Sequence, residues 1–144
     1  MGVSLICLDT NYLIGSITRD SLEARAVRDW IREGERLITP MPAWYEFLCG
    51  PANEGQIATV RAILDEITVF AEPQALEAAR LFNATGRKRT LHVDCMIAAT
   101  ALIAGATLAT RNRSDFIPFS AFGLLLTPEA QPTPTPYSLD RNAT

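Results

Sequence analysis

The chain has 144 residues, of which 48% are hydrophobic and 20% are charged, and its formal net charge at pH 7 is −3. This length and composition are typical of one soluble globular domain with a sizeable core. The weak negative charge excludes a protein that binds nucleic acid through a global positive field, so any such contact must come from a local basic patch.

The three cysteines occur singly among apolar neighbours, with no C-x-x-C or metal-ligand spacing, which favours buried reduced thiols. The apolar run Val3–Leu8 ends at Asp9 and is too short for a signal peptide. No stretch approaches the roughly 18 apolar residues that a membrane span requires. We therefore expect a cytoplasmic protein that makes no membrane contact.

Short apolar runs alternate with segments of helical periodicity, which are bounded by polar caps, prolines and glycines. In chain order, the predicted elements are strand Val3–Leu8, helix Asn11–Thr18, helix Leu22–Ile31, strand Arg36–Thr39, helix Ala43–Cys49, helix Gln56–Ile67, strand Thr68–Phe70, helix Pro73–Gly86, helix Leu91–Gly105, strand Thr107–Ala109 and a last apolar run, Phe122–Leu126. This alternation predicts an α/β fold: a central parallel sheet of four to five short strands, flanked by helices on both faces.

The composition changes after residue 126. Residues 127–144 are rich in proline and have no apolar periodicity. We therefore predict a folded domain over residues 1–126 and a disordered Pro-rich tail over residues 127–144.

The segment Leu91–Gly105 is apolar and rich in alanine, and it contains a single acid, Asp94. On a helix, Asp94 shares one face with Ile97, Ala98 and Ala101, so it begins the inward stripe. Desolvating a lone carboxylate there costs several kcal/mol, by rough estimate, unless a partner or a metal ion offsets that cost.

Three further acids are prominent in the predicted fold. Asp9 ends the first strand, where open α/β sheets bind their ligands. Glu46 lies within an apolar helix, and Asp115 follows Thr107–Ala109. Each acid, taken alone, also has a structural interpretation: Asp9 and Asp115 as helix N-caps, Glu46 as a surface acid, and Asp94 as an acid at its own helix N-terminus.

The predicted connections can bring all four acids to one edge of the sheet, where they would repel one another without a cation. Oxygen ligands without histidine or cysteine suit Mg²⁺ or Mn²⁺. Such an open site can hold a phosphodiester and activate a water for in-line attack. The residues therefore indicate metal-dependent phosphodiester hydrolysis.

Four segments resemble the PIN-domain ribonucleases, in particular the VapC toxins of type II toxin–antitoxin systems. Residues 8–14 (LDTNYLI) resemble the opening motif of that family, and residues 46–50 (EFLCG) its second acidic segment. Residues 94–101 follow its D-x-x-I-A-A-x-A pattern, and residues 110–116 its T-x-N-x-x-D-F pattern. The four segments occur in the expected order over about residues 3 to 126.

The resemblance implies a PIN-like fold and a Mg²⁺-dependent endoribonuclease that also accepts Mn²⁺. It further implies an RNA substrate, a cognate antitoxin and a homodimer. It assigns Asp9 and Asp94 as metal ligands and Glu46 as the third acid, acting directly or through water. Some relatives have an acid at the position of Asn112, whereas the acid in this chain is Asp115, three residues later. We therefore expect Asp115 to be the fourth catalytic and metal-binding acid, and Asn112 to support the site by holding a metal-bound water or orienting Asp9.

The same resemblance leaves supporting roles for polar residues beside the acids. Thr10, Asn11 and Thr110 are expected to brace the carboxylates. Positive charge for RNA is expected from two groups of basic residues, which are Arg111 and Arg113 in the active-site loop and Arg87, Lys88 and Arg89 before the Asp94 helix. For Arg87–Arg89, a solvated basic turn is the alternative.

Two other functions are compatible with parts of this pattern. The first is a noncatalytic PIN-like module that binds RNA or protein, although the intact set of acids argues against it. The second is a phosphoryl-transfer enzyme with Asp9 as nucleophile. That chemistry requires a second aspartate where Asn11 stands and a suitably placed lysine, and the chain has a single lysine, Lys88.

Overall fold

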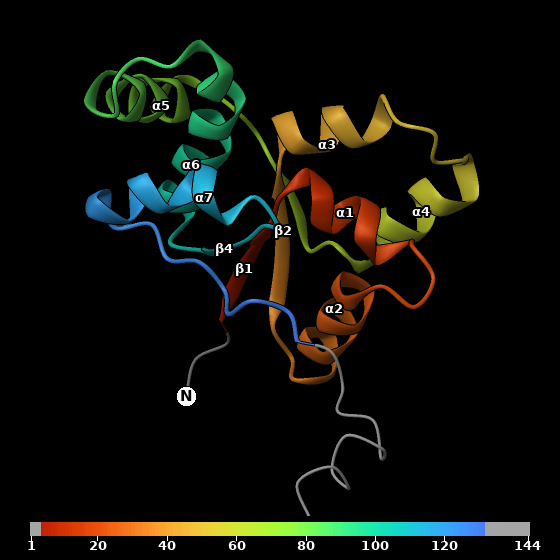
Figure 1. The fold of residues 1–144 in the computed structure, drawn as a ribbon. Helices are drawn as coiled ribbons and strands as arrows, with labels where there is room; N and C mark the ends of the chain where they lie inside the picture. Colours follow the sequence, from red (N-terminus) through yellow and green to blue (C-terminus); the bar gives the residue numbers. More distant parts are fainter. Residues whose placement is uncertain (1–3, 132–144) are drawn as a thin grey trace, which may run out of the picture.

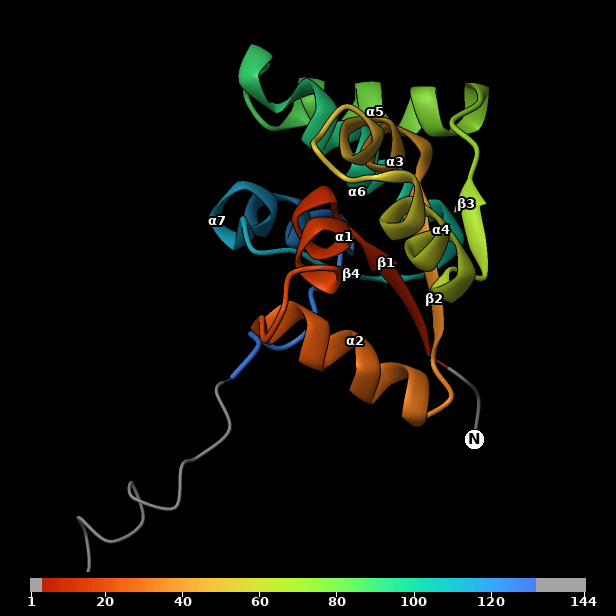
Figure 2. The same cartoon turned by 90° about the vertical axis from the view of Figure 1, so that its right-hand side faces the viewer.

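The computed structural model describes residues 4–131. Four parallel strands form one sheet in the order β3-β2-β1-β4. They are β1 (Leu5–Leu8), β2 (Arg36–Pro40), β3 (Glu66–Thr68) and β4 (Thr107–Ala109). Strand β1 pairs with both β2 and β4, and β3 forms one edge of the sheet (Figure 2). The predicted parallel sheet is confirmed.

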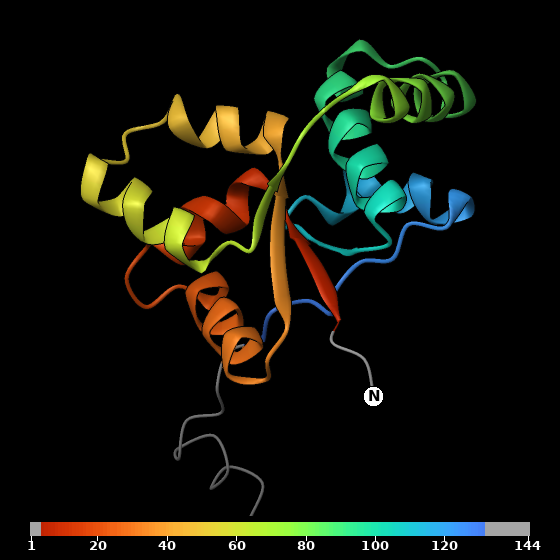
Figure 3. The same cartoon turned by 180° about the vertical axis from the view of Figure 1, so that it is seen from behind.

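Helices cover both faces of this sheet, as predicted. Within residues 4–131 they are α1 (Thr10–Ser16), α2 (Leu22–Arg32), α3 (Met41–Leu48), α4 (Glu54–Ile63), α5 (Glu72–Ala84), α6 (His92–Ala104) and α7 (Arg113–Phe116), with 3-10 turns η1 (Arg89–Leu91) and η2 (Ile117–Phe122). Helices α1, α2 and α4 lie on one side of the sheet, and α5, α6 and α7 lie on the other (Figure 1, Figure 3). Helix α3 contacts both α1 and α6.

The region between α4 and β3 differs from the sequence prediction, which extended the helix to Ile67 and began the strand at Thr68. Helix α4 ends at Ile63, and β3 begins at Glu66. Asp65 explains the early break, because its N–H donates to the carbonyl of Leu37 and its Oδ2 accepts from the Leu37 N–H, both at 2.8 Å. These bonds to β2 replace the helical bonds that the local periodicity favours.

The last apolar run, Phe122–Leu126, adds no fifth strand to the four-stranded sheet of the described residues. Phe122 ends η2, and only Leu126 forms a parallel bridge, to Leu108 in β4. Thr127 is buried and donates its N–H to the carbonyl of Leu108, so contacts with the sheet continue one residue past the predicted domain boundary at 126. Residues 132–144 of the predicted tail lie outside the described residues.

The core is built where α6 packs against β2 and β4. Ala98, Ala99 and Ala101 are completely buried there, because their small side chains allow the helix to lie close to the sheet. Two of the cysteines, Cys7 and Cys95, are buried as predicted. The third, Cys49, is exposed because it follows α3 at the surface.

None of the helices within residues 4–131 has the length and apolar character that a membrane crossing requires.

Candidate active site

Asp9 lies immediately after the central strand and begins helix α1. Its Oδ1 accepts a hydrogen bond from the Thr10 N–H at 2.7 Å, so the side chain caps the helix N-terminus as well as facing the edge of the sheet. The residue is 4% exposed. The position follows from the sheet order, since β1 lies between β2 and β4 and their carboxyl ends surround Asp9.

Two polar side chains fix the second carboxylate oxygen of Asp9. The hydroxyl of Thr110, at the end of β4, donates to Oδ2 at 2.7 Å, and Asn11 Nδ2 donates to the same atom at 3.3 Å. Burial raises the pKa of Asp9 above its usual range although the bonds from Thr110, Thr10 and Asn11 oppose that rise, and the charge of Asp115 adds to it. The predicted bracing contacts of Asn11 and Thr110 are present in the structure.

Glu46 and Asp94 reach the same edge from two helices that contact each other, α3 and α6. Asp94 is half-buried in the first turn of α6. Burial and, in second place, the negative charges of Asp9, Asp115 and Glu46 together raise the pKa of Asp94 to about 6. Glu46 is exposed as a whole residue, but partial burial and then the charge of Asp9 raise its pKa as well.

Asp115 and Asn112 occupy different positions in the loop after β4. Asp115 lies in the short helix α7, is partly buried, and its charge acts on both Asp9 and Asp94. Asn112 is exposed and precedes α7 without a side-chain cap, and its backbone N–H donates to Thr110 Oγ1 at 3.0 Å. Of the two residues, Asp115 is the one with negative charge close to the other acids.

The four acids thus come from four separate elements, and the charges of neighbouring acids help to raise the pKa of Asp9, Glu46 and Asp94. Within residues 4–131, no group of three or more histidine, cysteine, aspartate or glutamate side chains is arranged so that it could hold a metal ion as it stands. The donor chemistry nevertheless fits a hard divalent cation, because all the donors are carboxylate oxygens whose repulsion a cation would relieve. A further oxygen, the buried Thr10 Oγ1, has no hydrogen-bond partner among the described residues.

The basic residues predicted to bind RNA are mostly engaged in contacts of their own. Arg111 Nε lies 3.2 Å from Glu23 Oε1, and Arg113 donates to the carbonyl of Thr127 at 2.6 Å. The second group precedes α6. In it Arg87 has a positive φ of 58° and its guanidinium lies over the ring of Phe82, whereas Lys88 and Arg89 are exposed in the turn.

Sequence reasoning missed Glu23, which is buried next to Arg111. In the sequence Glu23 is an ordinary acid in the first turn of a capped helix, and its partner lies far away along the chain. No local pattern could have identified the pair.

Comparison with known proteins agrees with this architecture. The PIN domain model matches residues 6–117. No curated protein sequence matches the chain significantly.

Three solved structures share the fold. A toxin–antitoxin complex from Klebsiella pneumoniae has a TM-score of 0.67 at 23% identity and covers 88% of this chain and 99% of its own. DNA-bound VapBC from Salmonella typhimurium has a TM-score of 0.66 at 19% identity, covering 88% and 98%. FitAcB from Neisseria gonorrhoeae has a TM-score of 0.64 at 21% identity, covering 85% and 96%. With the family match over residues 6–117, the protein belongs to the PIN domain family.

Proposed function

We propose that this protein is a Mg²⁺-dependent endoribonuclease, the toxin of a toxin–antitoxin pair, which hydrolyses phosphodiester bonds in RNA. The observation that supports this most is electrostatic: the charges of Asp9, Asp115 and Glu46 all help to raise the pKa of Asp94. Membership in the PIN domain family and the fold shared with toxin–antitoxin complexes also support it. Its place of action is then the cytoplasm, where RNA is available.

In this proposal Asp9 and Asp94 hold the metal directly, and Glu46 and Asp115 complete its ligand set directly or through water. Bound Mg²⁺, or Mn²⁺ in its place, offsets the charge of the phosphodiester and lowers the pKa of a water ligand. The chain's own contribution is orientation. Thr110 and Asn11 donate hydrogen bonds to the carboxylate of Asp9 and thereby set its orientation.

We propose that the antitoxin binds in a groove between α2 and α4. This cavity has a volume of about 500 Å³ and combines apolar side chains, among them Val27, Ile31 and Ile63, with the cationic Arg19 and Arg28. An apolar floor with a charged rim suits an amphipathic helix that lays its apolar side into the groove.

We propose that two copies of the chain form a homodimer through an apolar surface beside Glu46. This surface surrounds a hollow of about 620 Å³ and is formed by Met41, Tyr45, Leu48, Phe70 and Val93. Tyr45 is 66% exposed. Large apolar side chains gathered on one surface indicate a protein contact. A second copy on this surface would bring two active sites near each other.

The test is incubation of purified protein with total RNA, with and without Mg²⁺, followed by sequencing of the new 5′ ends. We expect Mg²⁺-dependent cleavage by the wild type and a severe loss of cleavage in Asp94→Asn. Binding of RNA without cleavage under any metal condition would contradict the proposal and favour a noncatalytic module.

A further inference from the structure

Glu23 is a buried acid that the proposed chemistry does not use. It lies in the first turn of α2 and is 8% exposed. A Cβ added at Gly15 in α1 would lie 2.5 Å from the Glu23 Cβ, so the two helices approach closely at this point only because residue 15 is glycine. The Glu23 side chain therefore has little freedom to move, and its charge needs a fixed partner.

That partner is Arg111, whose Nε lies 3.2 Å from Glu23 Oε1. The Arg111 side chain is 65% exposed, whereas that of Glu23 is 10% exposed. The pair is thus asymmetric: Arg111 can return to water without Glu23, but Glu23 without Arg111 loses its ion-pair partner while it stays buried.

Arg111 belongs to the loop that holds Asp9. Its backbone N–H donates to Asn11 Oδ1 at 3.0 Å, and Asn11 Nδ2 in turn donates to Asp9 Oδ2 at 3.3 Å. Its neighbour Thr110 donates to the same Asp9 oxygen at 2.7 Å. Glu23 is therefore linked to Asp9 through Arg111 and the two side chains that orient the carboxylate.

We propose that Glu23 is a positioning residue for the active site: by holding the guanidinium of Arg111, it fixes the Thr110–Asn112 loop and thereby the direction of the Asp9 carboxylate. This role rests on the proposed metal-dependent function. It gives a structural reason for keeping an acid buried beneath Gly15.

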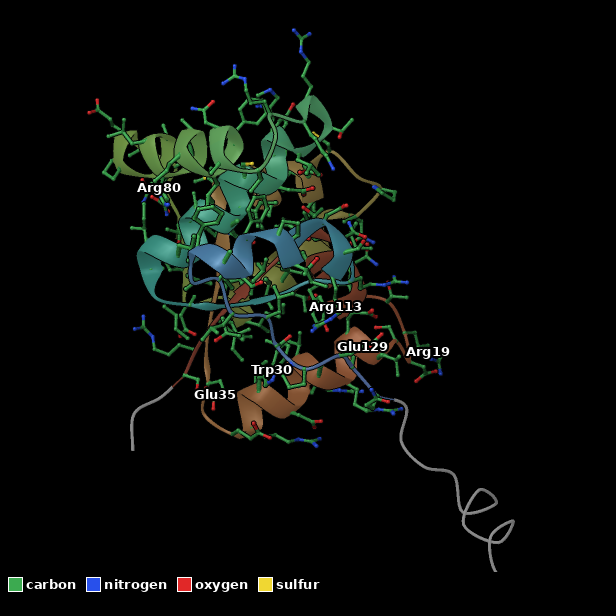
Figure 4. All side chains as sticks on the ribbon, turned by 60° about the vertical axis from the view of Figure 1, so that its left-hand side comes forward. Arg19, Trp30, Glu35, Arg80, Arg113 and Glu129 are labelled. Carbon is green, nitrogen blue, oxygen red and sulfur yellow. The ribbon has the colours of Figure 1, made fainter. Side chains whose placement is uncertain are left out.

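The surroundings of Arg111 favour this role over direct RNA binding. Arg111 and Arg113 line a polar hollow of about 300 Å³ together with the acids Glu23 and Glu129. Arg113 and Glu129 lie close together beside α2 (Figure 4). Two acids among two arginines leave little net positive charge for a phosphate, whereas a paired guanidinium is well suited to hold a loop in place.

The test uses the full chain and three variants, Glu23→Gln, Arg111→Met and the double variant. For Glu23→Gln we expect kcat to fall on the order of tenfold and the half-saturating Mg²⁺ concentration to rise, with KM for RNA unchanged. The double variant should be no worse than Arg111→Met, because both substitutions break the same link. Arg111→Lys should retain most activity, since it keeps a cation beside Glu23.

Calorimetric titration of the RNA-free protein with Mn²⁺ gives a readout that does not depend on cleavage, and Glu23→Gln should bind Mn²⁺ more weakly than the wild type. Asp29→Asn is the matched control, because Asp29 lies on the same helix in an exposed pair with Arg32. It should leave cleavage and Mn²⁺ binding unchanged.

If Glu23→Gln keeps the kcat, the Mg²⁺ response and the Mn²⁺ affinity of the wild type, the positioning role is wrong. The positioning role is also wrong if Arg111→Met raises the KM for RNA and if its effect on activity adds to that of Glu23→Gln in the double variant. If the wild type cleaves no RNA, the proposed function fails, and the Mn²⁺ titration of Glu23→Gln alone decides the positioning role. A wild type that binds no Mn²⁺ would contradict both proposals.

Discussion

The hydroxyl of Thr110 donates a 2.7 Å hydrogen bond to Oδ2 of Asp9, and this bond joins the ends of β4 and β1 across 101 residues of sequence. The same hydroxyl oxygen accepts the N–H of Asn112 at 3.0 Å. Thr110 is 3% exposed, so water has little access to replace these bonds. The orientation of Asp9 thus depends on a neutral side chain directly after the neighbouring strand.

We expect Thr110→Val to weaken both metal binding and the fold. Valine keeps the shape but leaves a buried carboxylate without one donor and the Asn112 N–H without its acceptor. The loss of a hydrogen bond to a charged group is worth about 1.5–3 kcal/mol. Urea unfolding and Mn²⁺ calorimetry measure the two effects.

Thr100→Val is the matched control, because Thr100 is a fully buried threonine on α6 whose hydroxyl donates to the neutral carbonyl of Met96. It should alter stability without altering Mn²⁺ affinity. Equal Mn²⁺ affinities in the wild type and Thr110→Val would show that Thr110 has no bracing role.

The pKa of Asp94, raised to about 6, predicts how stability depends on pH in the metal-free protein. An unfolded aspartate titrates near 3.9, so between about pH 4 and 6 the folded state binds more protons, and stability falls as pH rises through that window. Because Asp94 is only half-buried and solvent screens it, we expect a loss on the order of 1 kcal/mol.

Urea unfolding in EDTA from pH 4 to 7 measures this loss, and Asp94→Asn should show a flatter profile than the wild type. The raised pKa values of Asp9 and Glu46 act in the same direction, so a residual slope should remain in the variant. Superimposable slopes for the two proteins would refute the raised pKa of Asp94.

Asp9→Asn and Asp94→Asn should each lower RNA cleavage by roughly 10²–10³-fold, the usual cost of removing one preorganised electrostatic group. An amide keeps the shape but removes the charge, so we expect both variants to fold. In thermal melts Mn²⁺ should raise the melting temperature of the wild type, because it binds the folded state preferentially, and should raise that of the variants less.

Glu72→Gln, an exposed acid in the first turn of α5, is the control for this series and should behave as the wild type does. Full activity in Asp94→Asn, free of wild-type contamination, would remove Asp94 from the mechanism. Identical wild-type melts with and without Mn²⁺ at neutral pH would contradict the metal site.

The proposed homodimer predicts that the wild type sediments at twice the 15.8 kDa chain mass. Tyr45→Glu places a charge in the middle of the apolar surface and should shift the protein toward the monomer. Leu76→Glu is the control, because Leu76 is equally exposed, at 66%, but lies on α5 outside that surface. A monomeric wild type at all concentrations tested would refute the dimer.

Much of the fold was predictable because local patterns and tertiary contacts agree. Ser21 caps the N-terminus of α2, and Gly105 ends α6 with a φ of 69°, and the sequence predicts a helix boundary at both positions. The prediction was wrong where a distant contact overrides the local pattern. Residues 64–67 continue a helical periodicity, but the two bonds between Asp65 and Leu37 draw the chain into the sheet.

In the candidate site, too, local patterns were predictable from the sequence and distant contacts were not. Asp9 and Asp94 could be found because an acid beside a buried strand or on an inward helix face is unusual in any sequence. The link between Glu23 and Arg111 could not be found, because each residue type is ordinary at its own position and their contact forms only in the folded chain. The folded chain also shows Arg111 paired with an acid, which a sequence pattern of basic residues does not indicate.

The last prediction separates Asp115 from Asn112. The charge of Asp115 raises the pKa of both Asp9 and Asp94, whereas Asn112 is exposed and contacts the site through its backbone N–H on Thr110. We therefore expect Asp115→Asn to raise the half-saturating Mg²⁺ concentration by roughly 10–100-fold, the range for residues that support a metal site. Asn112→Ala should lower the rate at saturating Mg²⁺ with less effect on that concentration.

Asn112→Asp is the informative companion variant, because it introduces an acid at the alternative position while Asp115 remains. We expect it to stay at least partly active, since a carboxylate there keeps the acceptor oxygen of asparagine and leaves the Thr110 contact, which uses the backbone, intact. A magnesium titration of the three variants decides between the residues. If Asn112→Ala shows the larger defect in metal affinity, the two roles are exchanged and Asp115 serves only the first turn of α7.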